Sequence, residues 1–150
     1  MLRRLQSVSG KNIDTQLKAA VTMVRGRLVQ KDIVNGTVIL PTSQEGLFLV
    51  DKDVQPTGLM AYEGEISDYD TRLETIAQND FVQTEKPISG ERFATTEFVA
   101  TGFSVGDYAE VSTVVDATQG KMIKKATAGA FKYDGTVVEN GHTLAIFEVV

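Results

Sequence analysis

The sequence predicts a mainly β protein, an antiparallel β-barrel or sandwich with one short helix and an extended N-terminal arm. Short apolar and β-branched runs recur between glycine-containing turns at a spacing of about 8 to 12 residues, which is typical of such folds. An Asn-Gly pair at residues 35–36 separates two of these runs and is a strong hairpin signal. The 150 residues are enough for one hydrophobic core, to which seven Phe and four Tyr contribute.

The first 18 residues differ from the rest in charge. They contain Arg3, Arg4, Lys11 and Lys18 against a single acid, Asp14, so their net charge is +4 − 1 = +3. The whole chain carries −5, which leaves −8 for residues 19–150. We expect residues 1–18 to form a docking arm whose four cations contact a partner, and residues 19–150 to form a single β-rich domain. The acidic body should repel nucleic acid, so no nucleic-acid partner is expected.

Two alternatives remain open for residues 13–24. Ile13, Leu17, Val21 and Val24 recur at helical spacing, which favours a helix. The β-branched run over residues 21–24 fits a strand equally well.

The following elements are strands and turns. Residues 27–34 and 37–40 flank the Asn-Gly turn, and Pro41 ends the second strand or confines it to an edge. A short apolar run predicts a buried strand over 46–50, and a turn at 56–58 precedes another run at 59–62. Thr71 and Glu74 fit a capping box that starts the short helix. Strands are predicted in the second half at 93–100, 107–115, 120–126, 135–139 and 143–149.

Residues 102–106 match the G-x-S-x-G pattern that presents a nucleophilic serine in many hydrolases. Ser104 is followed by Asp116, Asp134 and Glu139 and then by the only histidine, His142, in the order Ser, acid, His. A nucleophile elbow requires a helix directly after the serine, whereas residues 107–115 alternate and predict a strand. We therefore interpret residues 102–106 as a strand-connecting turn and expect no catalytic residues, with Phe103 and Val105 anchoring the turn to the core.

Other kinds of site find little support. Residues 63–74 are acidic, but Arg72 occupies the position of a third oxygen ligand of a calcium-binding EF-hand, the required glycine is absent and Asn79 occupies the position of the bidentate glutamate, so an EF-hand is excluded. A looser calcium site, or a carboxylate pair acting on a sugar, stays open for this segment. The chain has no cysteine and one histidine, and no phosphate-binding glycine loop is present. We expect no metal, no cofactor and, since no apolar run reaches about 18 residues, no membrane partner.

The overall pattern resembles that of phage capsid decoration (cement) proteins. The motifs that carry the resemblance are short: Arg25-Gly26-Arg27-Leu28-Val29, Asn35-Gly36-Thr37-Val38, Pro56-Thr57-Gly58-Leu59, Gly90-Glu91-Arg92-Phe93, Phe103-Ser104-Val105-Gly106-Asp107-Tyr108, Gly120-Lys121 and Leu144-Ala145-Ile146-Phe147-Glu148-Val149-Val150.

The resemblance implies a non-enzymatic virion protein on the outer surface of an icosahedral capsid. Such a protein binds the major capsid protein, often as a homotrimer, and stabilises the shell by bridging its subunits. A phage tail or head-to-tail connector protein and a carbohydrate-binding β-domain are the alternatives.

Overall fold

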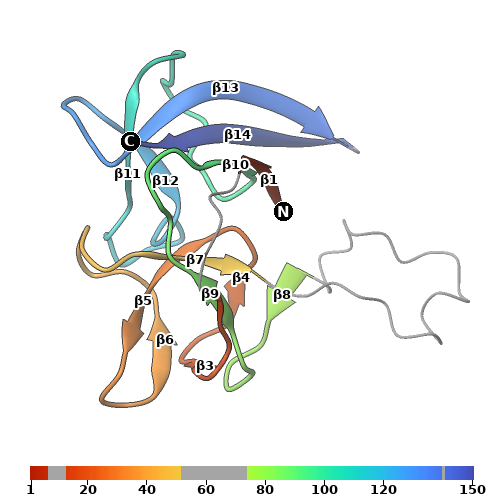
Figure 1. Ribbon diagram of the computed structural model, residues 1–150, viewed down its shortest axis with the longest axis vertical. Coiled ribbons are helices and arrows are strands. Elements are labelled where there is room, and N and C mark those ends of the chain that lie inside the picture. Colours follow the sequence, from red (N-terminus) through yellow and green to blue (C-terminus); the bar gives the residue numbers. More distant parts are fainter. Residues whose placement is uncertain (7–12, 52–73, 140) are drawn as a thin grey trace, which may run out of the picture.

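The computed structural model describes residues 1–6, 13–51, 74–139 and 141–150. These residues form a mainly β structure with two six-stranded sheets and one two-stranded sheet. Figure 1 shows the first six-stranded sheet in the upper half of the molecule and the second in the lower half. The predicted β class and the antiparallel sheets are confirmed. Among the described pairings, none closes either sheet into a barrel.

The first sheet has the strand order β1-β10-β14-β13-β11-β12 and is antiparallel throughout. Its long hairpin, β13 and β14, provides the centre, and the remaining strands flank it. The bounds are β1 Leu2–Gln6, β10 Arg92–Thr95, β11 Tyr108–Val111, β12 Met122–Lys125, β13 Phe131–Glu139 and β14 His142–Val149.

The second sheet has the order β2-β9-β7-β5-β6-β3, in which only β3 and β6 pair in parallel. A separate pair, β4 with β8, lies beside it. The bounds are β2 Ile13–Asp14, β3 Lys18–Ala19, β4 Met23–Val24, β5 Leu28–Asp32, β6 Thr37–Ile39, β7 Phe48–Asp51, β8 Thr75–Ile76 and β9 Gln83–Glu85.

The largest hydrophobic cluster joins the two six-stranded sheets. Leu28 and Leu49 of the second sheet are buried in it together with Phe93, Phe131 and Phe147 of the first. The rings of Phe93 and Phe131 meet edge to face with centroids 6.2 Å apart, an arrangement that aromatic pairs favour. A second cluster, which includes Met23, Val29 and Val50, lies within the lower half. The chain therefore buries its apolar surface in a core shared by both sheets.

Two glycines allow the sheets to approach each other closely. A Cβ atom on Gly120, whose φ is +85°, would lie 2.7 Å from the carbonyl oxygen of Leu28, and the Leu28 amide donates to the Gly120 carbonyl at 3.0 Å. A Cβ on Gly26 would lie within contact distance of Thr95 and 3.0 Å from the Met1 carbonyl oxygen. Both positions combine positive φ with close packing, which only glycine tolerates.

The Asn-Gly hairpin is confirmed, but its strands are shorter than predicted. The last paired residues are Asp32 and Thr37, so Ile33 and Val34 belong to a four-residue loop with Asn35 and Gly36. The Asp32 carboxylate ends the strand by accepting hydrogen bonds from the Asn35 backbone N–H at 3.1 Å and its side-chain amide at 2.6 Å. Only Gly36 has a positive φ, whereas a two-residue type I′ turn needs two such residues.

The prediction of an extended N-terminal arm is wrong for the residues described. Residues 2–6 form β1, which pairs with β10, and Met1 and Leu2 are buried. The predicted boundary between residues 18 and 19 falls inside β3. The helical alternative for residues 13–24 is also wrong, because that segment contains β2, β3 and β4. These pairings join residues distant in sequence, so the local pattern contains no trace of them.

The strand predictions for the second half hold with shifted ends. All five predicted segments contain a strand, although 93–100 and 107–115 are only about half paired and the strand predicted at 135–139 begins earlier, at Phe131. Glycine-containing turns separate the strands as expected. The predicted turn at 56–58, the run at 59–62 and the helix start at Thr71 lie outside the described residues. The part of the short helix predicted around Ile76 is wrong, because Thr75 and Ile76 form strand β8, which pairs with β4.

Candidate docking surface

The turn around Ser104 connects two strands and is fixed by Asp107. The Asp107 carboxylate accepts a hydrogen bond from the Ser104 backbone N–H at 2.6 Å and forms an ion pair with Lys124 at 2.7 Å. These contacts hold the pKa of Asp107 below its ordinary value, the Lys124 hydrogen bond having the largest effect. Strand β11 follows the turn, in agreement with the prediction that no helix begins here.

One of the two expected anchors of this turn is confirmed. Phe103 packs against Tyr133 and Phe147, with ring centroids 4.8 and 5.8 Å away. Val105 is 70% exposed, so its expected anchoring role is wrong.

The three acids that follow Ser104 in the Ser, acid, His order each bind a different partner. Asp116 binds Thr118 in its own loop, Asp134 forms an ion pair with Arg92, and Glu139 forms one with Arg3. Ser104 lies in the β10–β11 turn and His142 at the start of β14, both exposed. The acidic stretch 63–73 lies outside the described residues.

The predicted docking cations do not form one exposed arm. Arg4 lies between Asp51 and Glu85, at 3.1 and 2.7 Å, and Arg3 bonds Glu139 at 2.5 Å. The Lys18 ammonium lies over the Phe81 ring, 5.2 Å from its centroid. Lys11 lies outside the described residues. The three described cations instead connect β1 and β3 to carboxylates and an aromatic ring elsewhere in the fold.

The loop between β11 and β12 exposes two valines to solvent and is held by hydrogen bonds among its own residues. Val114 is 61% exposed and Val115 is 86% exposed. Next to them, Asp116 accepts hydrogen bonds from the Thr118 backbone N–H and hydroxyl, both at 2.6 Å, which lower its pKa. The Thr118 hydroxyl also bonds that of Ser112 at 2.9 Å. The loop is therefore held in place by its own polar residues while its apolar residues stay uncovered.

Residues 41–46 connect this loop to the second sheet. The Gln44 side chain donates to the Val111 carbonyl at 2.6 Å and accepts from the Val111 N–H at 3.1 Å, as a paired strand residue would. The Gln119 amide donates to the Pro41 carbonyl at 3.1 Å. Residues 41–46 are thus bonded both to β11 and to the loop that follows it.

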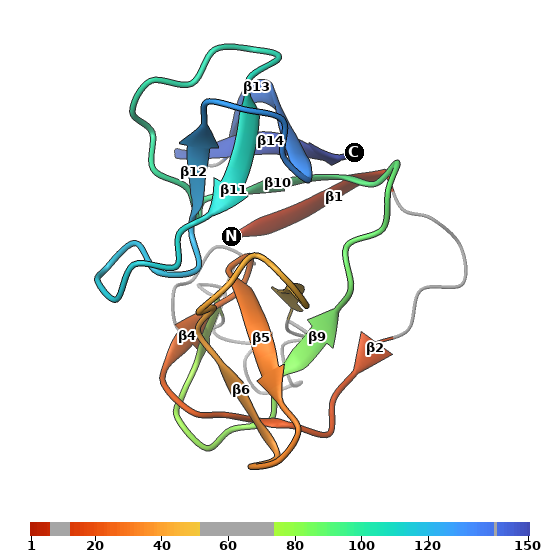
Figure 2. The ribbon, with the colours of Figure 1, turned by 90° about the vertical axis from the view of Figure 1, so that its left-hand side faces the viewer.

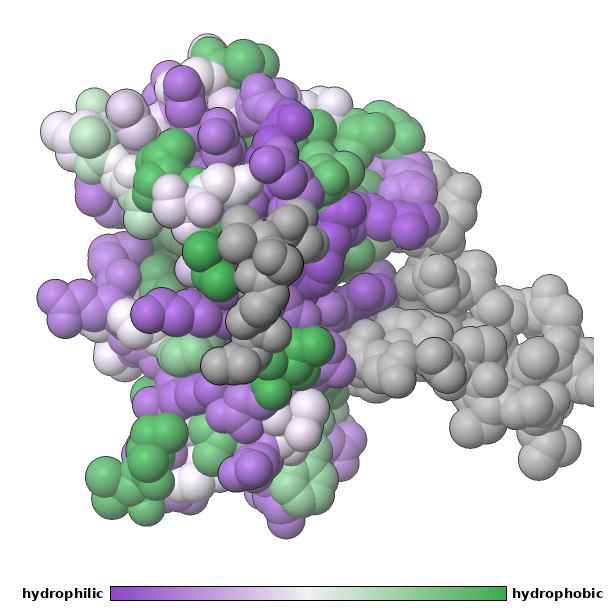
Figure 3. Space-filling view, viewed as in Figure 1, coloured by the Kyte–Doolittle hydropathy of each residue, from purple (hydrophilic) through white to green (hydrophobic). Residues whose placement is uncertain are grey.

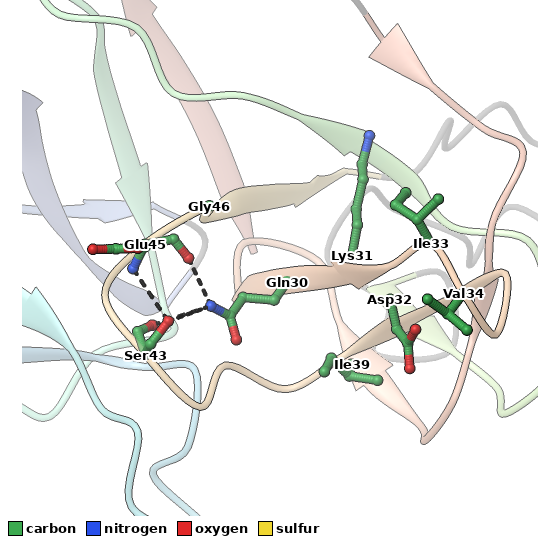
Figure 4. Close-up of a pocket in the computed structure, with 9 residues that line it drawn as sticks. All are labelled: Gln30, Lys31, Asp32, Ile33, Val34, Ile39, Ser43, Glu45 and Gly46. Carbon is green, nitrogen blue, oxygen red and sulfur yellow. Dashed lines mark hydrogen bonds between the residues drawn. The ribbon is translucent and has the colours of Figure 1, made fainter.

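An open groove lies on the other side of residues 41–46. It has a volume of about 640 Å³ and is lined by Gln30, Lys31, Asp32, Ile33, Val34, Ile39, Ser43, Glu45 and Gly46. Figure 4 shows the Gln30 amide bridging to Ser43 and Glu45, with Ile33 and Val34 at the opposite end of the groove. The Gln30 contacts, at 2.7 Å to the Ser43 hydroxyl and 2.6 Å to the Glu45 carbonyl, fix the wall formed by residues 43–45.

We call the groove together with Val114 and Val115 the loop surface. Val34 is 95% exposed and Ile33 is 72% exposed. Apolar side chains stand out at the lower left of Figure 3, where Figure 1 shows the turn between β5 and β6. Figure 2 faces this side of the molecule and shows the β5–β6 hairpin below the β11–β12 loop. Paired exposed apolar side chains on preformed loops are typical of interaction sites.

Sequence reasoning missed the loop surface because it assigned these valines to strands. Residues 33–34 and 114–115 are β-branched and continue the strand patterns before them. The sequence signal for these loops is an aspartate in each. Asp32 and Asp116 accept a hydrogen bond from the backbone N–H three and two residues later, as aspartates in turns commonly do.

Among the described residues, no group of three His, Asp or Glu side chains is placed to hold a metal ion. Within the same residues, no helix has the length and apolarity needed to cross a membrane. Comparison with protein-family models, curated proteins and solved structures found no match.

Proposed function

We propose that this chain is a non-enzymatic virion protein that binds the outside of an icosahedral phage capsid through the loop surface. In this proposal it stabilises the shell by bridging subunits of the major capsid protein. The two six-stranded sheets act as a sandwich-like scaffold that holds the loops in position.

The observation that supports docking most directly is that Val114 and Val115 are exposed on a loop that its own hydrogen bonds hold in place. Their loop is fixed by the Asp116, Ser112 and Thr118 contacts before any partner binds. Little conformational entropy is then lost on binding, and apolar area is removed from water. The neighbouring groove adds two more exposed apolar side chains, Ile33 and Val34.

The choice of a capsid as partner rests on the sequence resemblance to decoration proteins. A shell repeats one surface many times, so a site of modest affinity suffices when several copies of this chain act together. The expected homo-oligomer, with a trimer favoured, is part of this proposal.

The test is binding to empty capsids purified from the virus that encodes the chain. We expect Val114→Asp with Val115→Asp to lower occupancy by about tenfold or more, because a charge would be buried at the contact. The matched control is Val21→Asp, which changes a valine that is 41% exposed and lies outside the loop surface. Its occupancy should equal that of the unchanged protein.

Four outcomes would contradict the proposal. If the unchanged protein has no affinity for capsids, the capsid function is wrong. If it binds but the loop variants bind equally well, the loop surface is not the contact. A copy number on the order of a dozen or fewer per particle, rather than hundreds, would indicate a tail or connector ring instead of a shell lattice, and specific glycan binding would favour a carbohydrate-binding domain.

A further inference from the structure

The β13–β14 hairpin extends beyond the strands that flank it. Strand β14 pairs with β10 only from Ala145 to Glu148. Strand β13 pairs with β11 only at Phe131 and Lys132, and its last contact on that side is made by Tyr133, which exchanges hydrogen bonds with residues 106 and 107. Figure 1 shows the far end of the hairpin projecting past β10 and β11. The outer edge of residues 136–139 therefore has no neighbouring strand among the described residues.

The register identifies which backbone groups are unused on this edge. Glu139 and His142 are the last pair of the β13–β14 ladder and only two residues separate them in the sequence, so their backbone groups face each other. By alternation, Val137 faces Leu144, while the N–H and C=O groups of Thr136 and Val138 point away from β14. No hydrogen bond beyond the β14 ladder is made by either residue within the described structure.

The free edge also lacks the usual protection against pairing. Exposed edges of native sheets are generally blocked by lysine, proline or a bulge. The bulge of β13 lies earlier, between Tyr133 and Gly135. The sequence that follows, Thr136-Val137-Val138, is entirely β-branched, and Val138 is 68% exposed and Val137 39% exposed.

We propose that this edge pairs antiparallel with the same edge of a second copy of the chain, across a two-fold axis at Val137. Thr136 then lies opposite Val138 of the other copy and exchanges two hydrogen bonds with it, and the symmetric pair exchanges two more. The two Val137 residues form the close, non-hydrogen-bonded pair at the centre. This register uses the outward backbone groups of Thr136 and Val138 in both copies, and it makes the same β-branched segment its own partner across the two-fold axis.

The local charges permit this contact even though the chain carries −5 overall. Two carboxylates flank the free edge, and both are already neutralised: Glu139 by Arg3 and Asp134 by Arg92. In the proposed register Glu139 lies opposite Gly135 of the other copy, so no like charges face each other. The inference is independent of the loop surface, and it revises one part of the proposed function: the basic unit is a two-fold dimer in place of the favoured trimer.

The first experiment is cross-linking of Val137→Cys. The chain has no cysteine of its own, so this thiol is unique. Non-hydrogen-bonded antiparallel pairs have Cα atoms about 4.5 Å apart, within the range that a disulfide spans. In a glutathione redox buffer we expect a disulfide-linked dimer to form at least about tenfold faster than for the control Val115→Cys, which places a thiol at a more exposed position in the β11–β12 loop.

The second experiment measures the dimer by sedimentation velocity. Val138→Pro removes an outward N–H without removing a bond to β14, and we expect it to raise the dimer dissociation constant about tenfold or more. Val138→Thr keeps that N–H and should dimerise like the unchanged chain. Circular dichroism verifies that both variants fold.

Failure of these results would overturn the inference. A chain that remains monomeric at all accessible concentrations, with Val137→Cys cross-linking no faster than Val115→Cys, excludes the pairing. An oligomer that forms equally well with Val138→Pro uses a different interface. Because neither measurement involves capsids, both outcomes are separate from the failure of the proposed function.

Discussion

At the scale of single residues, short aspartate contacts decide which side chains reach the solvent. Asp32 and Asp116 accept hydrogen bonds within their own loops, Asp107 accepts them from Lys124 and Ser104, and each has a lowered pKa for that reason. The loops of Asp32 and Asp116 begin earlier than the β-branched pattern indicates. Ile33, Val34, Val114 and Val115 are left outside the sheets as a result.

Loss of the Asp116 side chain should therefore have a pH-dependent effect. Because the folded-state pKa lies below the unfolded value of about 3.9, the stabilisation is complete above that value and disappears as the pH falls through the folded-state pKa. We expect Asp116→Ala to be less stable than the unchanged protein at neutral pH, with the difference shrinking below about pH 4.

The measurement is chemical denaturation at several pH values. Asp80→Ala is the matched control, since Asp80 is exposed and its side chain makes no hydrogen bond within the described structure. A difference for Asp116→Ala that stays constant down to the lowest pH would show that its carboxylate does not fix the loop through its charge.

At the scale of elements, a side chain takes the place of a strand. Gln44 bonds both backbone groups of Val111, which is completely buried, and so connects the 41–46 loop to β11. The pairing residues are 67 positions apart. Nothing in the local sequence around Gln44 distinguishes it from the other glutamines, whereas the turn that Phe103 anchors could be predicted from its own glycines.

Replacing Gln44 should weaken the connection between the two sheets. Gln44→Ala leaves a partly buried N–H and C=O unpaired, which costs about 1 to 3 kcal/mol of unfolding free energy. Gln78→Ala, at an exposed position, should change the free energy by no more than about 0.5 kcal/mol. Denaturant unfolding measures both. Equal effects of the two substitutions would mean that water replaces the Gln44 amide without loss.

At the scale of the whole molecule, the N-terminal strand is part of the core. Leu2 is 2% exposed in the cluster that both sheets share, and the Met1 ammonium lies 2.5 Å from the Glu74 carboxylate. Removing residues 1–18 would therefore destabilise the fold as well as delete the predicted arm. A test of capsid binding by such a deletion could not separate the two effects, which is why the loop variants are preferred.

Two leucines of β1 distinguish the strand from an arm. Leu2→Ala removes a buried side chain and should cost about 2 to 5 kcal/mol. Leu5→Ala changes a side chain that is 48% exposed and should cost much less. Thermal or denaturant unfolding provides the comparison. If both variants unfold like the unchanged protein, the Leu2 side chain of β1 does not contribute to the core.

The sequence by itself determined the β class, the hairpin at residues 35–36 and the approximate positions of the strands in the second half. Each depends on local properties: β-branched alternation and glycines that permit positive φ. Only the tertiary structure decided that residues 2–6 pair with β10, that Val105 is exposed while Phe103 packs partly buried against the core, and that no described strand pairs with the outer edge of β13 beyond Tyr133. Those outcomes depend on which distant strands compete for the same backbone groups and apolar area, and a local pattern contains no information about its distant partners.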